Sequence, residues 1–144
     1  MNIFEALRQD HEKQRLLLKI LVETHGDTAA RREYFDELKD ELERHATAEE
    51  RHFYIPLMDD DKAVELSRHG IAEHHEIDEL VEKLDDTEFS SPAWLRFLKQ
   101  LKEQVEHHLD DEEQAFFQIA GRVLNEKQKK ALGEAYRDEM SELA

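Results

Sequence analysis

Apolar residues recur every three or four positions along nearly the whole chain, and no convincing stretch alternates with a period of two. This spacing places the apolar side chains on one face of a helix and predicts α-helices rather than strands. Only four glycines and two prolines interrupt the pattern, so the helices should be long. We therefore expect an all-α protein.

Breaks in this pattern divide the chain into five predicted helices. Gly26 lies in the first break, and Pro56 is expected to end the second helix because it lacks a backbone N–H. Ser91 is placed to cap the fourth helix, with Pro92 at its first position. The predicted helices cover residues 3–24, 28–55, 60–84, 92–124 and 126–143.

Four long helices joined by short loops pack best as an antiparallel up-down four-helix bundle. No linker, repeat or low-complexity tract divides the chain, so we expect one domain over residues 1–144, with the bundle in residues 1–124. The short additional C-terminal helix, residues 126–143, has an apolar face that includes Leu132 and Tyr136. That face either covers the bundle or forms the surface of a homodimer.

Each of the four long helices carries one histidine on its apolar face, and the second and fourth add a glutamate one turn later. Burying an unpaired imidazole or carboxylate is costly, so such groups in four helices need a common explanation. A metal centre supplies one, because inward His and Glu side chains from facing helices hold pairs of metal ions in helical bundles. The candidate metal ligands are His11, His45, Glu49, His74, His108 and Glu112.

Other histidines and acidic residues are weaker candidates for metal ligands. The pairs His69/Glu73 and His75/Glu79 have the same spacing but polar neighbours, and we interpret both as solvated surface. His52 points inward without a carboxylate one turn later, which favours a structural or supporting role.

Two glutamates directly follow the candidate carboxylates. Glu50 and Glu113 either orient the ligating histidines or lie solvated on the surface.

Composition excludes several classes of partner and site. The net charge of -16, from 36 acidic and 20 basic side chains, would repel phosphate backbones and argues against nucleic acid. No apolar run approaches the length of a membrane span, so no membrane association is expected. The absence of cysteine excludes thiolate metal sites, and with no signal-peptide pattern in the first residues it favours a cytoplasmic location.

Four segments resemble the hemerythrin family, in its HHE cation-binding branch, over about residues 1–120. They are DHEKQ around His11, HATAEERHFYIP from His45 to Pro56, EHHEIDEL around His74, and HHLDDEEQAFF from His107 to Phe117. The resemblance implies two iron ions (Fe2+/Fe3+) with two bridging carboxylates. According to this resemblance, His11 and His45 bind one iron, and His74 and His108 bind the other. Glu49 and Glu112 bridge the two irons. Imidazole and carboxylate ligands also suit manganese or zinc.

The chain departs from the oxygen-carrying hemerythrins at two points. Those proteins have two histidines one turn apart on the third helix, whereas this chain has Gly70 at the earlier position. Their fourth helix also spaces its histidine and carboxylate one residue further apart. One iron therefore lacks a protein ligand or takes another, and Glu73, Glu50, Tyr54 and water are the candidates.

An iron with an open coordination position favours reaction with small molecules. The first functional hypothesis is a protein that binds or senses dioxygen (O2) or nitric oxide (NO). The alternatives are a di-iron enzyme that oxidises ferrous iron, decomposes peroxide or repairs iron centres under stress, and a protein for iron storage or delivery. A helical interaction module without metal is the remaining alternative, and it predicts equal folding with and without metal.

Overall fold

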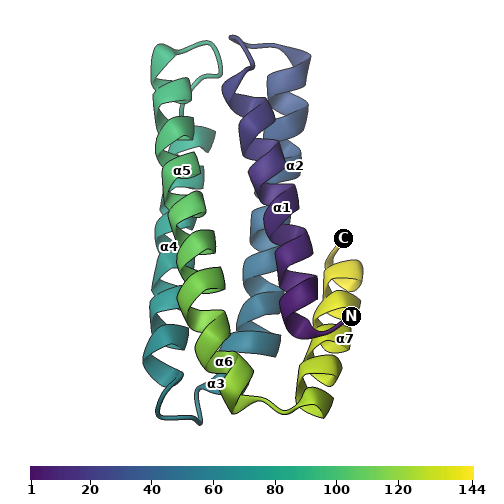
Figure 1. The fold of residues 1–144 in the computed structure, drawn as a ribbon. Coiled ribbons are helices and arrows are strands. Elements are labelled where there is room, and N and C mark those ends of the chain that lie inside the picture. Colours follow the sequence, from purple (N-terminus) through teal and green to yellow (C-terminus); the bar gives the residue numbers. More distant parts are fainter.

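The computed structural model describes residues 1–144 and contains helices and no strands, which confirms the all-α prediction. Figure 1 shows the long helical rods side by side, with the shorter helix α7 beside one end. The elements are α1 (Ile3–Val22), α2 (Ala29–Glu49), η1 (Glu50–Tyr54), α3 (Ile55–Leu57), α4 (Val64–Asp85), α5 (Pro92–Asp111), η2 (Glu112–Phe116), α6 (Phe117–Val123) and α7 (Glu126–Leu143).

The rods run alternately up and down, as the short loops require (Figure 1). Helix α1 packs against α2 and α5, and α4 packs against α5. The second rod is α2, η1 and α3 in continuous succession, and the fourth is α5, η2 and α6. No helix is both long and apolar enough to cross a membrane.

The predicted end of the second rod at Pro56 was wrong. The rod continues through α3 to Leu57, because the chain first makes a π turn over Glu50–Tyr54. Pro56 then lies in the first turn of a new helical segment, where a missing backbone N–H costs little.

The predicted start of the third helix at Asp60 was also wrong, because α4 begins at Val64. The side chain of Asp60 accepts a hydrogen bond from the backbone N–H of Lys62 at 2.8 Å. Such a local bond stabilises a turn in competition with a helix. The later start brings His74 closer to the beginning of its helix, as the depths of the other candidate ligands require.

Both π turns follow the same short pattern, in which a histidine precedes a glutamate by four residues. In η1 the backbone N–H of Ile55 bonds to the carbonyl of Glu50, and in η2 that of Phe117 bonds to Glu112. A hydrogen bond across five residues adds one residue to the turn and changes the phase of every side chain after it. The aromatic residues that follow each glutamate are therefore directed into the core.

The apolar core consists of two clusters separated along the bundle. The first includes Leu18, Leu38 and Trp94, and it fills the end near the α1–α2 and α4–α5 loops. The second includes Ile3 and Phe53, and it fills the opposite end beneath α7. Along α1, the candidate ligand His11 lies between Leu7 of the second cluster and Leu17 of the first.

Helix α7 begins and ends where the sequence predicted, and its apolar face lies against α1 and α2 of its own chain. Tyr136 is fully buried there. Gly133 permits the close approach, because a Cβ at this position would lie 2.6 Å from backbone atoms of Met1 and Asn2. Of the two roles left open for this face, the structure therefore has it covering the bundle.

We expect Gly133→Ala to destabilise the docking of α7. Overpacking against backbone that cannot move away costs about 1–3 kcal/mol, which outweighs the helix propensity that alanine gains. Urea denaturation followed by circular dichroism should show a net loss of up to about 2 kcal/mol in the free energy of unfolding.

Gly121→Ala is the matched control, because a Cβ at Gly121 would meet no atom within 4 Å. It should leave the free energy of unfolding unchanged or raise it. Equal losses in the two variants would contradict the close approach of α7.

Candidate metal centre

The six candidate ligands predicted from the sequence come together in one buried layer of the bundle. They project from α1, α2, α4, α5 and η2, so all four long rods contribute. None is more than 5% exposed to solvent, in a chain where most charged side chains lie at the surface. Four imidazoles and two carboxylates thus share an interior from which water is excluded.

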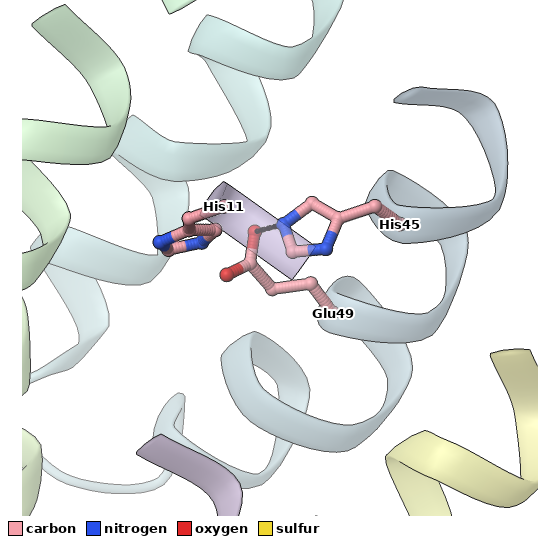
Figure 2. Close-up of side chains that lie close together, drawn as sticks. All are labelled: His11, His45 and Glu49. Carbon is pink, nitrogen blue, oxygen red and sulfur yellow. Dashed lines mark ion pairs between the residues drawn. The ribbon is translucent and has the colours of Figure 1, made fainter. Parts of the chain in front are cut away.

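Glu49 joins two groups of ligand atoms. One group is His11, His45 and Glu49, and the other is Glu49, His74 and His108; within each, the ligand atoms lie within 4.8 Å of one another. Figure 2 shows the Glu49 carboxylate between the imidazoles of His11 and His45. Its Oε1 lies 3.4 Å from Nε2 of His45 and 3.0 Å from Nε2 of His74. One carboxylate is therefore within reach of both groups.

Glu112 occupies a comparable position across the layer. Its Oε1 lies 3.2 Å from Nε2 of His11, and its Oε2 lies 3.6 Å from Nε2 of His108. Both carboxylates thus lie between one histidine of the first group and one of the second. This is the arrangement that two bridging carboxylates need.

Three of the four imidazoles are fixed from behind by carboxylates, which accept a hydrogen bond from Nδ1. The pairs are His11 with Glu113 at 2.7 Å, His74 with Glu50 at 2.8 Å, and His108 with Glu73 at 2.7 Å. Such partners orient a ligating imidazole and increase its basicity, leaving Nε2 directed inward. Of the two roles left open for Glu50 and Glu113, the structure supports the orienting one.

The fourth imidazole is fixed by the C-terminal helix. Nδ1 of His45 lies 2.6 Å from the hydroxyl of Tyr136, which in turn donates to Asp10 at 2.6 Å. No sequence pattern assigns Tyr136 this role, because its partner is far away in the chain and belongs to no shared motif. Helix α7 therefore supports the centre as well as covering the bundle.

The interpretation of Glu73 as solvated surface was wrong. Its side chain is buried against α5, although His69 one turn earlier is exposed. The residues around Glu73 in the sequence are polar, so the sequence did not indicate that its own side chain points towards His108. The pair His75/Glu79 is exposed, as predicted.

His52 does have a carboxylate partner, which comes from α7. Its Nε2 lies 2.7 Å from Oε1 of Glu139, and Arg51 pairs with the same carboxylate. This contact joins η1 to α7 and gives His52 the structural role predicted for it.

The inward-facing atoms of the layer lack hydrogen-bond partners. They are Nε2 of His11, His45 and His74, both carboxylate oxygens of Glu49, and Oε1 of Glu112. Buried polar atoms nearly always have partners, so a convergent set without them requires an explanation. All are lone-pair donors of the kind that bind divalent and trivalent metal ions, and the residues present therefore fit a metal centre.

Without metal, protons compensate part of the buried negative charge. Burial alone would lower the pKa of His11, but the nearby carboxylates of Glu112 and Glu113 outweigh burial and raise that pKa to about 9. Burial is likewise outweighed at His74, where Glu49 and Glu50 raise the pKa to about 10. A metal ion that binds these nitrogens must displace the protons.

Two small cavities reach the layer from the side of α4. One is lined by Gln14, Leu42, His45, Ala46, His74, Ile77, Asp78 and His108. The other is lined by Leu66, His69, Gly70, Glu73, His108, Asp111, Glu112 and Phe116. Each measures about 10 Å³, which is room for about one water-sized molecule.

We expect the stability of the metal-free protein to fall as the pH rises from 6.5 to 10. A histidine whose pKa is higher in the folded state stabilises that state fully below its unfolded pKa, about 6.5. This contribution is lost as the pH rises through the folded values of about 9 for His11 and about 10 for His74. Urea denaturation at several pH values measures the slope.

The His11→Gln, His74→Gln double variant isolates these two groups from the other titrations. Its slope over the same pH interval should be clearly smaller. An unchanged slope would show that the two imidazoles are not protonated in the metal-free fold.

Known proteins provide an independent comparison. Residues 2–120 match the family model described as the hemerythrin HHE cation binding domain. The fold is similar to the crystal structure of a hemerythrin HHE cation binding domain-containing protein from Mycobacterium kansasii, with 25% sequence identity and a TM-score of 0.88. That similarity covers 99% of this chain and 87% of the other. No curated protein sequence matches the chain.

The family match spans all four rods of the bundle and every one of the six buried candidate ligands. The resemblance inferred from the sequence is confirmed, and so is the hemerythrin-like bundle. The chain belongs to the hemerythrin HHE cation-binding family.

Proposed function

We propose that this protein holds two iron ions in the buried layer and that the iron centre binds a small diatomic ligand, dioxygen or nitric oxide. The observation that carries the proposal is the set of inward-facing nitrogen and oxygen atoms without hydrogen-bond partners. No hydrophobic core requires such a set, and a metal-free interaction module would gain nothing from it.

The positions of the two carboxylates support the assignment of ligands. In the proposal, His11 and His45 bind one iron, and His74 and His108 bind the other. Glu49 and Glu112 bridge them, since each lies between a histidine of one pair and a histidine of the other. Mixed imidazole and carboxylate ligands suit iron and would also accept manganese or zinc.

The cavity beside Gln14 supports a small ligand. It borders three of the four histidines and has room for about one water-sized molecule. Gln14 is 2% exposed, and its side-chain Nε2 has no hydrogen-bond partner. In the proposal this amide donates a hydrogen bond to the outer atom of the bound ligand, while the iron ions supply the electrons that bind it.

Metal analysis after anaerobic reconstitution with ferrous iron tests the metal part of the proposal. We expect two irons per chain in the wild type, and a loss of both in a variant with His11, His74 and His108 replaced by alanine. Each of these residues contributes a buried Nε2 that no other side chain replaces.

The matched control replaces the three exposed residues His25, His75 and His107 by alanine. It removes the same number of imidazoles and should keep two irons. Full iron binding by the buried triple variant, or none by the wild type, would contradict the proposed centre.

Replacement of Gln14 tests the ligand part of the proposal. We expect Gln14→Leu to keep both irons and to weaken the binding of nitric oxide by about tenfold, the effect of one lost hydrogen bond of about 1.4 kcal/mol. The dissociation constant from anaerobic titration of the ferrous protein is the measurement. Gln104→Leu, which alters only an exposed bond to Glu76, is the control.

Exposure of the ferrous protein to air distinguishes binding from catalysis. A visible absorption change that reverses on removal of oxygen supports a binding or sensing protein. Continued consumption of peroxide, or of added ferrous iron, would instead favour the enzymatic alternative.

A further inference from the structure

One of the two small cavities at the layer has a further group of potential metal ligands at its exposed rim. His69, Glu73 and Asp111 each offer one nitrogen or oxygen atom, and these atoms all lie within 4.8 Å of one another. His69 and Glu73 project from α4, one turn apart, and Asp111 is the last residue of α5. The same cavity is lined by His108 and Glu112 of the buried layer. The three residues, here called the rim site, therefore lie outside the proposed di-iron centre but next to it.

The spacing of the rim site is compatible with a shared cation. Nε2 of His69 lies 3.5 Å from Oε1 of Glu73 and 3.9 Å from Oδ2 of Asp111. Ligand atoms around a tetrahedral ion lie about 3.4 Å apart when each bond is about 2.1 Å long. The first distance fits already, and the second needs a movement of about half an ångström by two exposed side chains. One imidazole and two carboxylates suit Fe2+, Mn2+ or Zn2+.

An ordinary surface ion pair does not account for this group. His75 and Glu79 form such a pair elsewhere on α4, at 3.2 Å, and both residues are exposed. Glu73 is instead buried, and its Oε1 also accepts a hydrogen bond from Nδ1 of His108 at 2.7 Å. The rim site thus includes a buried carboxylate that connects it to a histidine of the layer.

The charge of the cavity lining favours a cation. Three carboxylates line it, those of Glu73, Asp111 and Glu112, together with two imidazoles and no lysine or arginine. A recess lined by one sign of charge raises the local concentration of the opposite ion and its rate of association. The net charge of -16 adds an attraction for cations over the whole surface.

The inner end of the cavity offers ligand atoms that have no partner. Glu112 is 3% exposed, and its Oε1 makes no hydrogen bond. The cavity measures about 10 Å³, so a metal ion must lose most of its water to pass through it. Removing an ion from water is costly unless other ligands replace the water. The rim site supplies such ligands at the outer end, and the layer supplies them at the inner end.

We propose that His69, Glu73 and Asp111 form a third metal site, which binds a divalent cation at the rim of the cavity and passes it to the buried centre. The delivery role rests on the proposed function, because it needs metal in the layer, whereas binding at the rim does not. The rim site binds more weakly than the centre, because two of its three ligands are exposed and lose side-chain freedom when the ion binds.

Equilibrium dialysis with Zn2+ tests binding at the rim site. We expect three Zn2+ per wild-type chain, one of them bound more weakly than the other two. The His69→Ala, Asp111→Asn double variant should keep two, and it should bind the third at least about tenfold more weakly. Both replaced residues are exposed, so the fold should tolerate the change.

The matched control is the His75→Ala, Glu79→Gln double variant. It removes one imidazole and one negative charge from an exposed pair on the same helix, and it should keep three Zn2+. A third Zn2+ that is retained in the rim variant, or lost equally in both variants, would overturn the rim site.

Stopped-flow mixing of the metal-free protein with ferrous iron tests delivery. We expect the rim variant to fill the centre about tenfold more slowly than the wild type, because the local attraction and the replacement ligands are lost. It should still reach two irons per chain, since all six ligands of the centre remain. The His75→Ala, Glu79→Gln variant should fill at the wild-type rate.

The outcomes separate the two proposals. Equal uptake rates in the wild type and the rim variant, or a final count below two irons in the rim variant, would overturn the delivery role alone. A wild type that takes up no iron but binds one Zn2+ dependent on His69 would overturn the proposed di-iron function and delivery, and it would support the rim site.

Discussion

The cost of removing six ionisable side chains from water is the constraint on which the rest of this structure depends. Isolated in an apolar interior, such groups would destabilise the fold by far more than a small domain can tolerate. The bundle offsets this cost of burial on the outer and on the inner side of the imidazoles. Behind the imidazoles, Nδ1 atoms are satisfied by carboxylates or by Tyr136. On the inner side, the nitrogen and oxygen atoms without hydrogen-bond partners converge. A few positive charges, as protons or metal ions, therefore neutralise the whole layer.

The same constraint gives a reason for the two π turns. The turn η1 begins directly after the inward-pointing Glu49, η2 begins at the inward-pointing Glu112, and each widens the helix by one residue. A regular helix would continue the polar stripe of His45 and Glu49 in phase with the residues that follow. The extra residue instead directs Phe53 and Tyr54, and likewise Phe116 and Phe117, into the apolar cluster below the layer. The layer of candidate ligands is thereby closed by aromatic rings at the point where the polar stripe ends.

The inward-facing side chains of this layer could be predicted from the sequence, because the spacing that identifies them is local. A histidine on an apolar stripe is visible at a spacing of three or four residues, and all six candidate ligands were found in this way. The helix boundaries at Pro56 and Asp60 depended on a π turn and on a side-chain hydrogen bond, which apolar periodicity does not report. Tyr136 and Glu73 were missed in their supporting roles because each meets its histidine through tertiary packing, without a shared pattern.

The supporting groups also make the two halves of the layer chemically different. Behind His74 and His108 lie two carboxylates, Glu50 and Glu73, and in front of them lies the phenol of Tyr54. In the other half, one carboxylate, Glu113, lies behind His11, and the neutral phenol of Tyr136 lies behind His45, with Asp10 one step further away. Negative charge close to a metal ion stabilises its higher oxidation state. Under the proposed assignment, the iron beside Tyr54 is therefore the one that the protein holds more firmly as Fe3+, and the iron between His11 and His45 is the one that is more easily kept as Fe2+.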